Sequence, residues 1–184
     1  MSEKKFYLTR YSFNEDRGVF VVDGGRKSLE DDFGFIRYKS ISGINSRGKQ
    51  KGVYVETYAE SEGSRVYFTS SAKREQITST LSLCVFGSSP ENTTEKSVYE
   101  RISIAENTWH SFCDWIENHL ILWYDEYRQR KALFYLSEAI EPKSDIIKNT
   151  PYLACDINLS NVFGKTFALD DNTIEDWLKA GGKG

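Results

Sequence analysis

Apolar and polar residues alternate with a period of two along much of this chain, which is the pattern of β-strands that bury one face. The clearest case is residues 77–86, where Ile77, Ser79, Leu81, Leu83 and Val85 fall on one face. Earlier stretches rich in strand-forming residues are separated by turn signals, and they cover residues 6–12, 19–23, 35–42, 53–58 and 65–69. Short strands joined by tight turns predict an antiparallel β-sandwich or barrel.

One segment has helical periodicity instead. Between residues 108 and 120 the apolar residues recur at helical spacing behind Asn107 and Thr108, which can cap a first turn: Trp109, Phe112, Cys113, Ile116 and Leu120. We expect this helix to pack on the sheet. The predicted class is therefore α+β and dominated by β-structure.

Residues 121–136 allow two interpretations. Residues 121–124 and 132–136 are dense in strand formers and flank a polar stretch, which predicts a hairpin. The alternative is a helix that continues to Glu138, because five residues also keep helical spacing: Trp123, Tyr124, Tyr127, Lys131 and Phe134. We favour the hairpin.

The C-terminal part has weaker signals. Pro142 and Pro151 predict an irregular connection, followed by strands at residues 152–159 and 166–169. Residues 173–180 predict a short helix in which Thr173 and Asp176 form a capping box. The glycine-rich end at 181–184 is expected to be mobile.

Length and composition indicate one domain over residues 1–184. No apolar run is long enough for a membrane-spanning helix and the N-terminus lacks a signal-peptide core, so we expect a cytoplasmic protein without membrane contact. The cysteines, Cys84, Cys113 and Cys155, are odd in number and lie beside apolar residues, which favours reduced core thiols.

Positive charge is concentrated in one place. Residues 37–51 hold five cations and no acidic residue, although the whole chain has a net charge of -3: Arg37, Lys39, Arg47, Lys49 and Lys51. Mutual repulsion keeps such charges hydrated until an anionic partner arrives. We predict a flexible interaction loop over residues 42–52.

A second stretch mixes aromatic and basic side chains, and its candidate interaction residues are Trp123, Tyr127, Arg128 and Arg130. Such a stretch could stack single-stranded bases. The plainer alternative is an amphipathic hairpin whose aromatic residues fill the core, and this alternative is favoured.

Signals for catalysis are weak. Residues 43–50 resemble a phosphate-binding loop, but Gln50 replaces the required hydroxyl and a strand follows instead of a helix. Glu30, Asp31 and Asp32 could hold magnesium for phosphoester chemistry, although a solvated turn is the commoner interpretation. His110 and His119 lie nine residues apart, on different sides of a helix. We therefore predict no catalytic residues, no metal, no cofactor and no enzymatic activity.

The order of these parts resembles the tail-tube and distal-tail proteins of tailed bacteriophages. The shared parts are a β-rich front half with a long basic loop, the strand ending at Phe86, one sheet-packing helix and a hairpin at 121–136. The resemblance implies a non-enzymatic virion component that forms a homo-oligomeric ring and contacts neighbouring structural proteins. Its basic loop would then contact an acidic region of the adjoining copy. The alternative is a nucleic-acid-binding β-barrel that uses the same cations.

Overall fold

We describe a computed structural model of the chain, covering residues 6–37, 42–43, 46–51, 53–57, 64–68, 74–87, 97–139, 141–147 and 150–183. Its main sheet is antiparallel and has ten strands: β1 (Phe6–Asn14), β2 (Val19–Val22), β3 (Lys27–Ser28), β4 (Ile36–Arg37), β7 (Ile77–Phe86), β8 (Leu120–Asp125), β9 (Arg130–Ala139), β10 (Lys143–Ile147), β11 (Thr150–Asn161) and β12 (Phe167–Ala168). A separate two-stranded sheet is formed by β5 (Val53–Thr57) and β6 (Ser64–Phe68), and the helices are α1 (Val98–Ile116) and α2 (Thr173–Lys179). The β-dominated antiparallel class, with one packed helix, a following hairpin and a short C-terminal helix, is confirmed.

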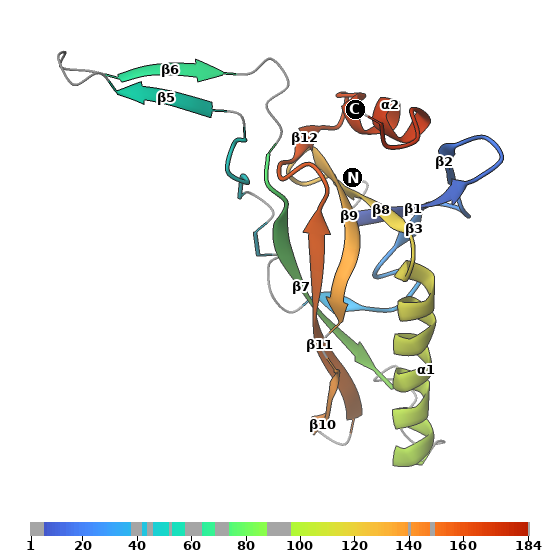
Figure 1. Cartoon of the computed structure of the whole chain (residues 1–184). Coiled ribbons are helices and arrows are strands. Elements are labelled where there is room, and N and C mark those ends of the chain that lie inside the picture. The colour runs from blue at the N-terminus through green and yellow to red at the C-terminus, as the bar shows by residue number, and fades with distance from the viewer. Residues whose placement is uncertain are drawn as a thin grey trace.

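The strand order of the main sheet is β2-β1-β8-β9-β11-β7-β4. Figure 1 shows α1 running along one side of this sheet. Strands β7 and β11 form the longest ladder, which extends from Tyr152↔Phe86 to Asn161↔Ile77. On the face under α1 this ladder is apolar, with Leu81, Leu83 and Ile157 in the core. The large core therefore lies between α1 and the β7–β11 ladder.

Helix α1 begins ten residues earlier than the predicted start at Thr108. Ser97 caps it, and Glu100 completes a capping box with Ser97. Thr108 lies inside the helix, where its hydroxyl donates to the carbonyl of Ile104 at 3.0 Å. The predicted end was also wrong, because the helix stops at Ile116 and Asn118 adopts a left-handed φ of 59°. Leu120 consequently belongs to β8.

The hairpin interpretation of residues 121–136 is confirmed, and the continuous helix is wrong. Strands β8 and β9 pair from Leu120↔Tyr135 to Asp125↔Arg130. Asp125 is buried and accepts hydrogen bonds from the Arg128 backbone at 2.9 Å and from the Arg128 guanidinium at 2.6 Å. These bonds fix the connecting turn, because a buried carboxylate is stabilised only when its oxygens are paired.

A second, smaller core lies on the other face of this hairpin. Alternation along β8 sends Ile121 and Trp123 toward α1 and Leu122 toward α2. Leu122 packs with Ile174 and Leu178 of α2 and with Phe167 of β12. The predicted capping box of α2 is wrong: Asn172 is the N-cap, and Thr173 donates to Asp171 instead of to Asp176.

Two strands were missed in the sequence. The predicted irregular connection between the prolines is strand β10, and β11 already begins at Thr150, so that Pro151 lies inside it and pairs with Ile146. Pro151 is the second residue of β11, near the strand start where a missing backbone donor is tolerated, and its carbonyl accepts from the Gly87 amide at 3.0 Å. Strand β3 has two residues and gave no periodic signal. Of the predicted strand at 35–42, residues 36–37 form β4 and residues 38–41 lie outside the described part.

None of the described helices has the length and apolar character needed to cross a membrane. The three cysteines are free thiols, with Cys84 and Cys155 buried and Cys113 packed against the core.

The side chain of Lys131 on β9 is 2% exposed, and its ammonium contacts a Glu175 carboxylate oxygen of α2 at 2.5 Å. We expect Glu175→Gln to lower the free energy of unfolding by about 1–3 kcal/mol, because a buried charge loses its partner. Asp176→Asn is the matched control, since Asp176 and Lys179 are 72% and 78% exposed and lie 3.9 Å apart. Urea unfolding measures both, and equal effects would contradict the structural role of the Lys131–Glu175 pair.

Stability at alkaline pH should also depend on two half-buried groups that lose a proton there, the Cys113 thiol and the Tyr124 phenol. Burial, together with the carboxylates of Glu117 and Asp114, raises the pKa of the Cys113 thiol to about 11. Burial also raises the pKa of Tyr124 to about 12. Because the pKa of the thiol is higher in the folded state, its contribution to stability is fully present below the unfolded thiol pKa of about 8.5. This contribution is lost as the pH rises through the pKa of the folded state.

We therefore expect the free energy of unfolding to fall between about pH 8.5 and 11, and Cys113→Ala to reduce that slope. Urea unfolding across this pH range measures it. A Cys113→Ala variant with an unchanged slope would refute the assignment to this thiol.

Candidate interaction surface

The cations predicted to form an interaction loop lie partly on an extended stretch, residues 46–51, which we call the basic segment. Its main chain is fastened to the residues preceding β7. Gln50 and Arg74 form an antiparallel bridge, and the Glu75 amide donates to the Lys49 carbonyl at 2.9 Å. The Arg74 guanidinium also donates to the Gly48 carbonyl at 3.0 Å. This part of the predicted loop is thus attached to the body of the molecule by its backbone.

A close approach of three backbone segments requires glycine at two positions. The Gly48 amide donates to the Gly164 carbonyl at 2.8 Å. A Cβ atom on Gly48 would lie 1.8 Å from the Glu75 carbonyl oxygen, and one on Gly164 would lie 2.0 Å from the same oxygen. Gly164 also has a left-handed φ of 61°. Gly48 therefore serves chain packing rather than phosphate binding, and strand β5 follows the segment.

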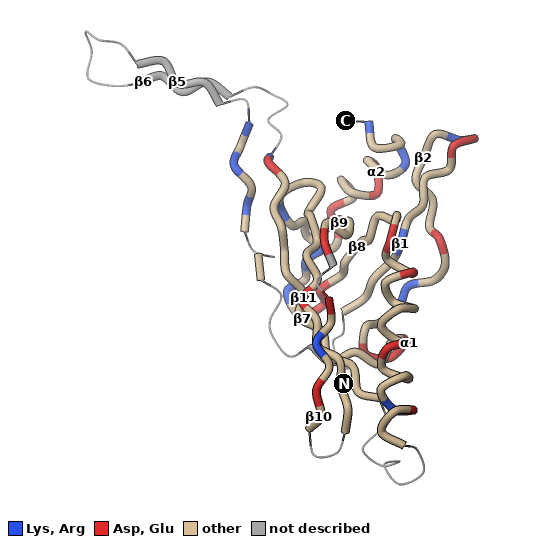
Figure 2. The backbone as a smooth tube through the Cα atoms, turned by 60° about the horizontal axis from the view of Figure 1, so that its bottom comes forward, with Lys and Arg blue, Asp and Glu red and all other residues tan. Residues whose placement is uncertain are grey.

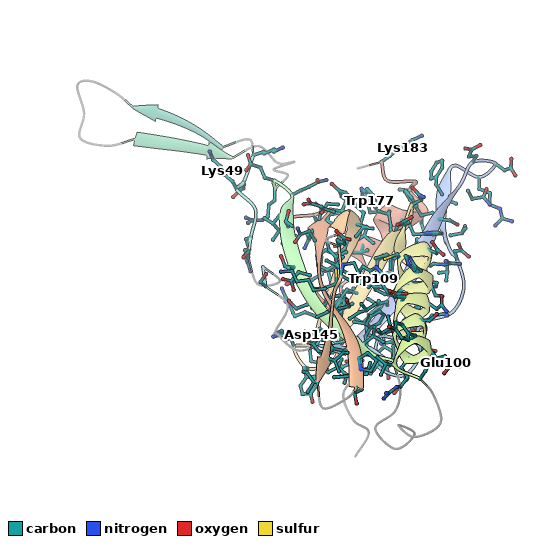
Figure 3. All side chains as sticks on the ribbon, turned by 90° about the horizontal axis from the view of Figure 1, so that it is seen from below. Lys49, Glu100, Trp109, Asp145, Trp177 and Lys183 are labelled. Carbon is teal, nitrogen blue, oxygen red and sulfur yellow. The ribbon has the colours of Figure 1, made fainter. Side chains whose placement is uncertain are left out.

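The side chains of the basic segment alternate in exposure. Arg47, Lys49 and Lys51 are exposed, Gly48 is buried and Gln50 is half-buried. Figure 2 shows these cations together beside the β5–β6 sheet, and Figure 3 shows Lys49 on the side of the molecule away from α1. Of the other predicted loop residues, Arg37 lies in β4, where its side chain is not described, and Lys39 lies outside the described residues.

The basic segment leads directly into the β5–β6 hairpin, which we call the arm. The arm is a two-stranded sheet of its own, and Figure 1 shows it extending away from the main sheet. Its register alternates apolar pairs, Val53↔Phe68 and Val55↔Val66, with the pairs Tyr54↔Tyr67 and Glu56↔Arg65. The Gln50–Arg74 bridge closes the arm at its root.

The second predicted interaction set is not brought together as a surface. Trp123 is fully buried in the large core, and Arg128 pairs with buried Asp125. Arg130 donates to the hydroxyl and the carbonyl of Thr166. Tyr127 is 62% exposed and stacks on Phe6 at 6.1 Å between ring centroids. This stretch is a structural hairpin in which Trp123 is inaccessible to bases.

The acidic triplet is engaged in its own turn. Asp32 accepts from the Ser28 amide at 2.6 Å, Glu30 accepts from the Ser28 hydroxyl, and the Asp31 amide donates to that hydroxyl. Among the described residues no group of three potential metal ligands is found.

The two histidines are far from forming a pair. His110 is exposed on α1, whereas His119 follows the helix and contacts the Asp23 carboxylate at 3.0 Å. Its other ring nitrogen lies 2.5 Å from the Glu117 carbonyl oxygen. Both nitrogens of His119 are thus engaged within the protein.

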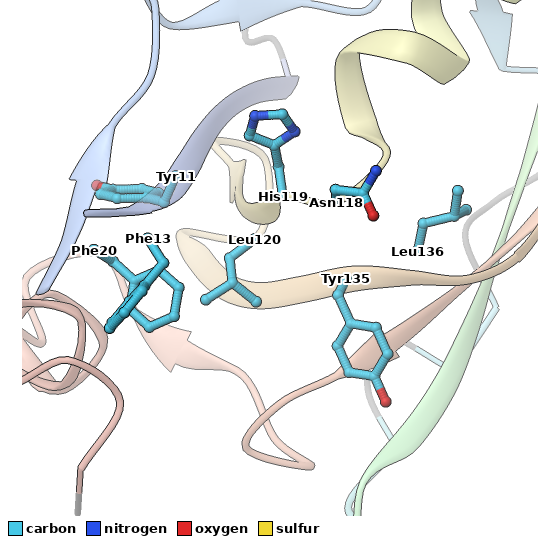
Figure 4. A pocket seen from close by; sticks show the side chains of 8 residues that line it. All are labelled: Tyr11, Phe13, Phe20, Asn118, His119, Leu120, Tyr135 and Leu136. Carbon is cyan, nitrogen blue, oxygen red and sulfur yellow. The ribbon is translucent and has the colours of Figure 1, made fainter. Parts of the chain in front are cut away.

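The residues near His119 also line a cavity of about 390 Å³, shown in Figure 4. Its walls are largely aromatic, with Tyr11, Phe13 and Phe20 on one side and Tyr135 on the other. The Tyr135 hydroxyl is engaged with Gln76 at 2.9 Å. The cavity is thus mainly aromatic, and the His119 ring and the Tyr135 hydroxyl at its wall have partners within the protein.

No protein-family model matches the chain, and no curated protein matches it in sequence.

Gly48→Ala should destabilise the attachment of the basic segment, because the added Cβ atom would overlap the Glu75 carbonyl. We expect a loss of about 1–3 kcal/mol in the free energy of unfolding, measured by urea denaturation. Gly25→Ala is the matched control, because a Cβ atom there meets nothing within 4 Å. We expect it to change stability by at most about 0.5 kcal/mol. Equal stability of the two variants would disprove the close packing around Glu75.

Proposed function

We propose that the protein is a non-enzymatic structural subunit of an oligomeric assembly, of the kind that builds a phage tail or another virion component. The observation that carries this proposal is the arm, whose two strands pair with each other, and with no other described strand, in a sheet separate from the main one. A two-stranded hairpin by itself is marginally stable in water and is stabilised by a further strand or by packing. A neighbouring subunit is the natural source of that packing.

The position of the basic segment supports the same proposal. Three exposed cations lie at the root of the arm on a backbone that is held in place by Arg74, Glu75 and Gly164. Charges presented on a fixed backbone lose little conformational freedom when they pair with an anionic surface. The arm and the basic segment together therefore form a continuous region suited to contacts between subunits.

Free strand edges also support assembly. Strand β2 ends the strand order on one side, and the outer strand β10 is exposed along its whole length, including Ile146 and Ile147. Exposed edges are pairing sites, and a closed ring of subunits can cover them.

A nucleic acid is the second candidate partner of the basic segment, because Arg47, Lys49 and Lys51 are exposed at alternate positions and could contact successive phosphates. Oligonucleotide binding should then weaken with salt, with a slope that falls by about one for each cation removed. The burial of Trp123 removes the aromatic platform that this function would use.

Replacing residues 52–72 by Asn-Gly tests the role of the arm. The Gln50–Arg74 bridge already holds the two ends together, so a two-residue turn can close the chain there. We expect the shortened protein to keep its main sheet and to lose self-association.

Sedimentation velocity measures the loss of association and circular dichroism measures the retained fold. The Gly25→Ala variant serves as an association-competent control. A shortened protein that folds and associates as well as the full chain would contradict the proposed role of the arm.

A further inference from the structure

The outward face of α1 is negatively charged and has no neighbour among the described elements. Glu106 and Asp114 are exposed and lie eight residues apart on the helix, and Glu117, the C-cap residue, is exposed directly after it. We call these three residues the acidic stripe. The only Lys or Arg of α1 is Arg101, and its side chain is buried. Tyr99, at the first turn of the helix, is 85% exposed. A charged helix face of one sign attracts a partner of the opposite sign.

The acidic stripe and the basic segment lie on opposite sides of the molecule. In Figure 2 the acidic positions of α1, drawn in red, lie apart from the basic positions of residues 46–51, drawn in blue. Figure 3 shows Lys49 and Glu100 on opposite sides of the sheet. The two surfaces of one chain therefore cannot meet each other. Two copies can bring them together by placing the basic segment of one against α1 of the next.

The spacing of the charges on the two surfaces agrees. In an extended chain the residues at i, i+2 and i+4 repeat at roughly 6.6 Å, so Arg47 and Lys51 are separated by roughly 13 Å along the segment. On a helix, eight residues rise by roughly 12 Å, which separates Glu106 from Asp114. A basic segment lying along α1 can thus place its outer cations beside these two carboxylates.

We infer that the acidic stripe of α1 is the docking surface for the basic segment of a second copy of this chain. The inference rests on the proposed function, and it names the partner of the basic segment. The contact joins two different surfaces, so it repeats head to tail and generates a ring or a filament. Strands β2 and β10 need not take part in it.

Charge reversal tests this contact in the full chain. Arg47→Glu with Lys49→Glu should weaken self-association by about tenfold or more, because like charges then face each other. Glu106→Lys with Asp114→Lys should do the same. An equimolar mixture of the two variants should associate again, since each interface then pairs opposite charges. Sedimentation velocity at low and high NaCl measures all three samples, and high salt should weaken the wild-type contact.

Arg17→Glu with Lys179→Glu is the matched control, because both side chains are exposed and lie outside the two surfaces. It changes the net charge by the same amount as Arg47→Glu with Lys49→Glu and should leave association unaltered. Circular dichroism verifies that every variant is folded.

The outcomes separate the inference from the proposed function. The inference is overturned, and the proposed function stands, if the wild-type chain associates and the charge-reversal variants associate equally well. The same holds if the mixture of the two variants fails to regain association. A wild-type chain that stays monomeric at low salt overturns both. A third outcome concerns nucleic acid. If the wild-type chain binds a single-stranded oligonucleotide, and Arg47→Glu with Lys49→Glu abolishes this binding without changing self-association, the basic segment is assigned to nucleic acid and the inference is overturned.

Discussion

The rest of the structure depends on the antiparallel ladder between β7 and β11. These strands are joined over ten residue pairs, and β11 pairs on its other side with β9 and β10. Because side chains alternate across a strand, this one register decides which residues enter the core and which face outward. If β11 slipped by one residue along the sheet, Ile157 would turn away from α1, and a slip of β7 would do the same to Leu83.

The two faces of this ladder have different chemistry. Leu81, Leu83 and Leu159 pack under α1. On the other face three successive pairs are polar, and in two of them the Ser82 and Thr80 hydroxyls donate to Asp156 and Asn158, whereas the pairs toward the end of β7, Cys84↔Ala154 and Phe86↔Tyr152, are not polar. Helix α2 covers the sheet at the β8–β9 hairpin, where Leu122 and Leu133 turn toward it, and at β2, where Phe20 stacks on Trp177. The sheet thus has one continuous apolar face and one that is apolar only in part, as expected for antiparallel sheets with a solvated side.

The same ladder positions the proposed interaction surfaces. Residues 74–75 extend β7 beyond the ladder and hold the basic segment, and α1 lies across β11 on the opposite side. The distance between the cations and the acidic stripe is therefore set by the rigid sheet between them. The acidic stripe lies on a regular helix, and the basic segment is an irregular stretch whose backbone is bonded to Glu75 and Gly164. Surfaces that are held in place in this way keep their geometry, which suits a repeating assembly.

The sequence by itself determined the elements whose signals are local. Alternation and strand-forming residues predicted β7 and most other strands, and the two runs of strand-forming residues on either side of a polar stretch predicted the β8–β9 hairpin. The start of α1 was predictable from Ser97 and Glu100, but the stronger apolar spacing after Thr108 concealed it, and with it the acidic residue Glu106 of the outward face.

Only the tertiary structure decided which distant segments meet. The contact of Gly48 with Glu75 and Gly164, the pairing of Lys131 with Glu175, and the burial of Trp123 join residues that no sequence periodicity relates. The sequence showed that residues 37–51 are basic, but the way Arg47 and Lys49 face solvent depends on bonds to a distant segment. The Arg74 guanidinium donates to the Gly48 carbonyl, and the Glu75 amide donates to the Lys49 carbonyl. The physical reason is that periodicity reports only which side of an element is apolar, whereas position in space depends on the register and packing of the whole sheet.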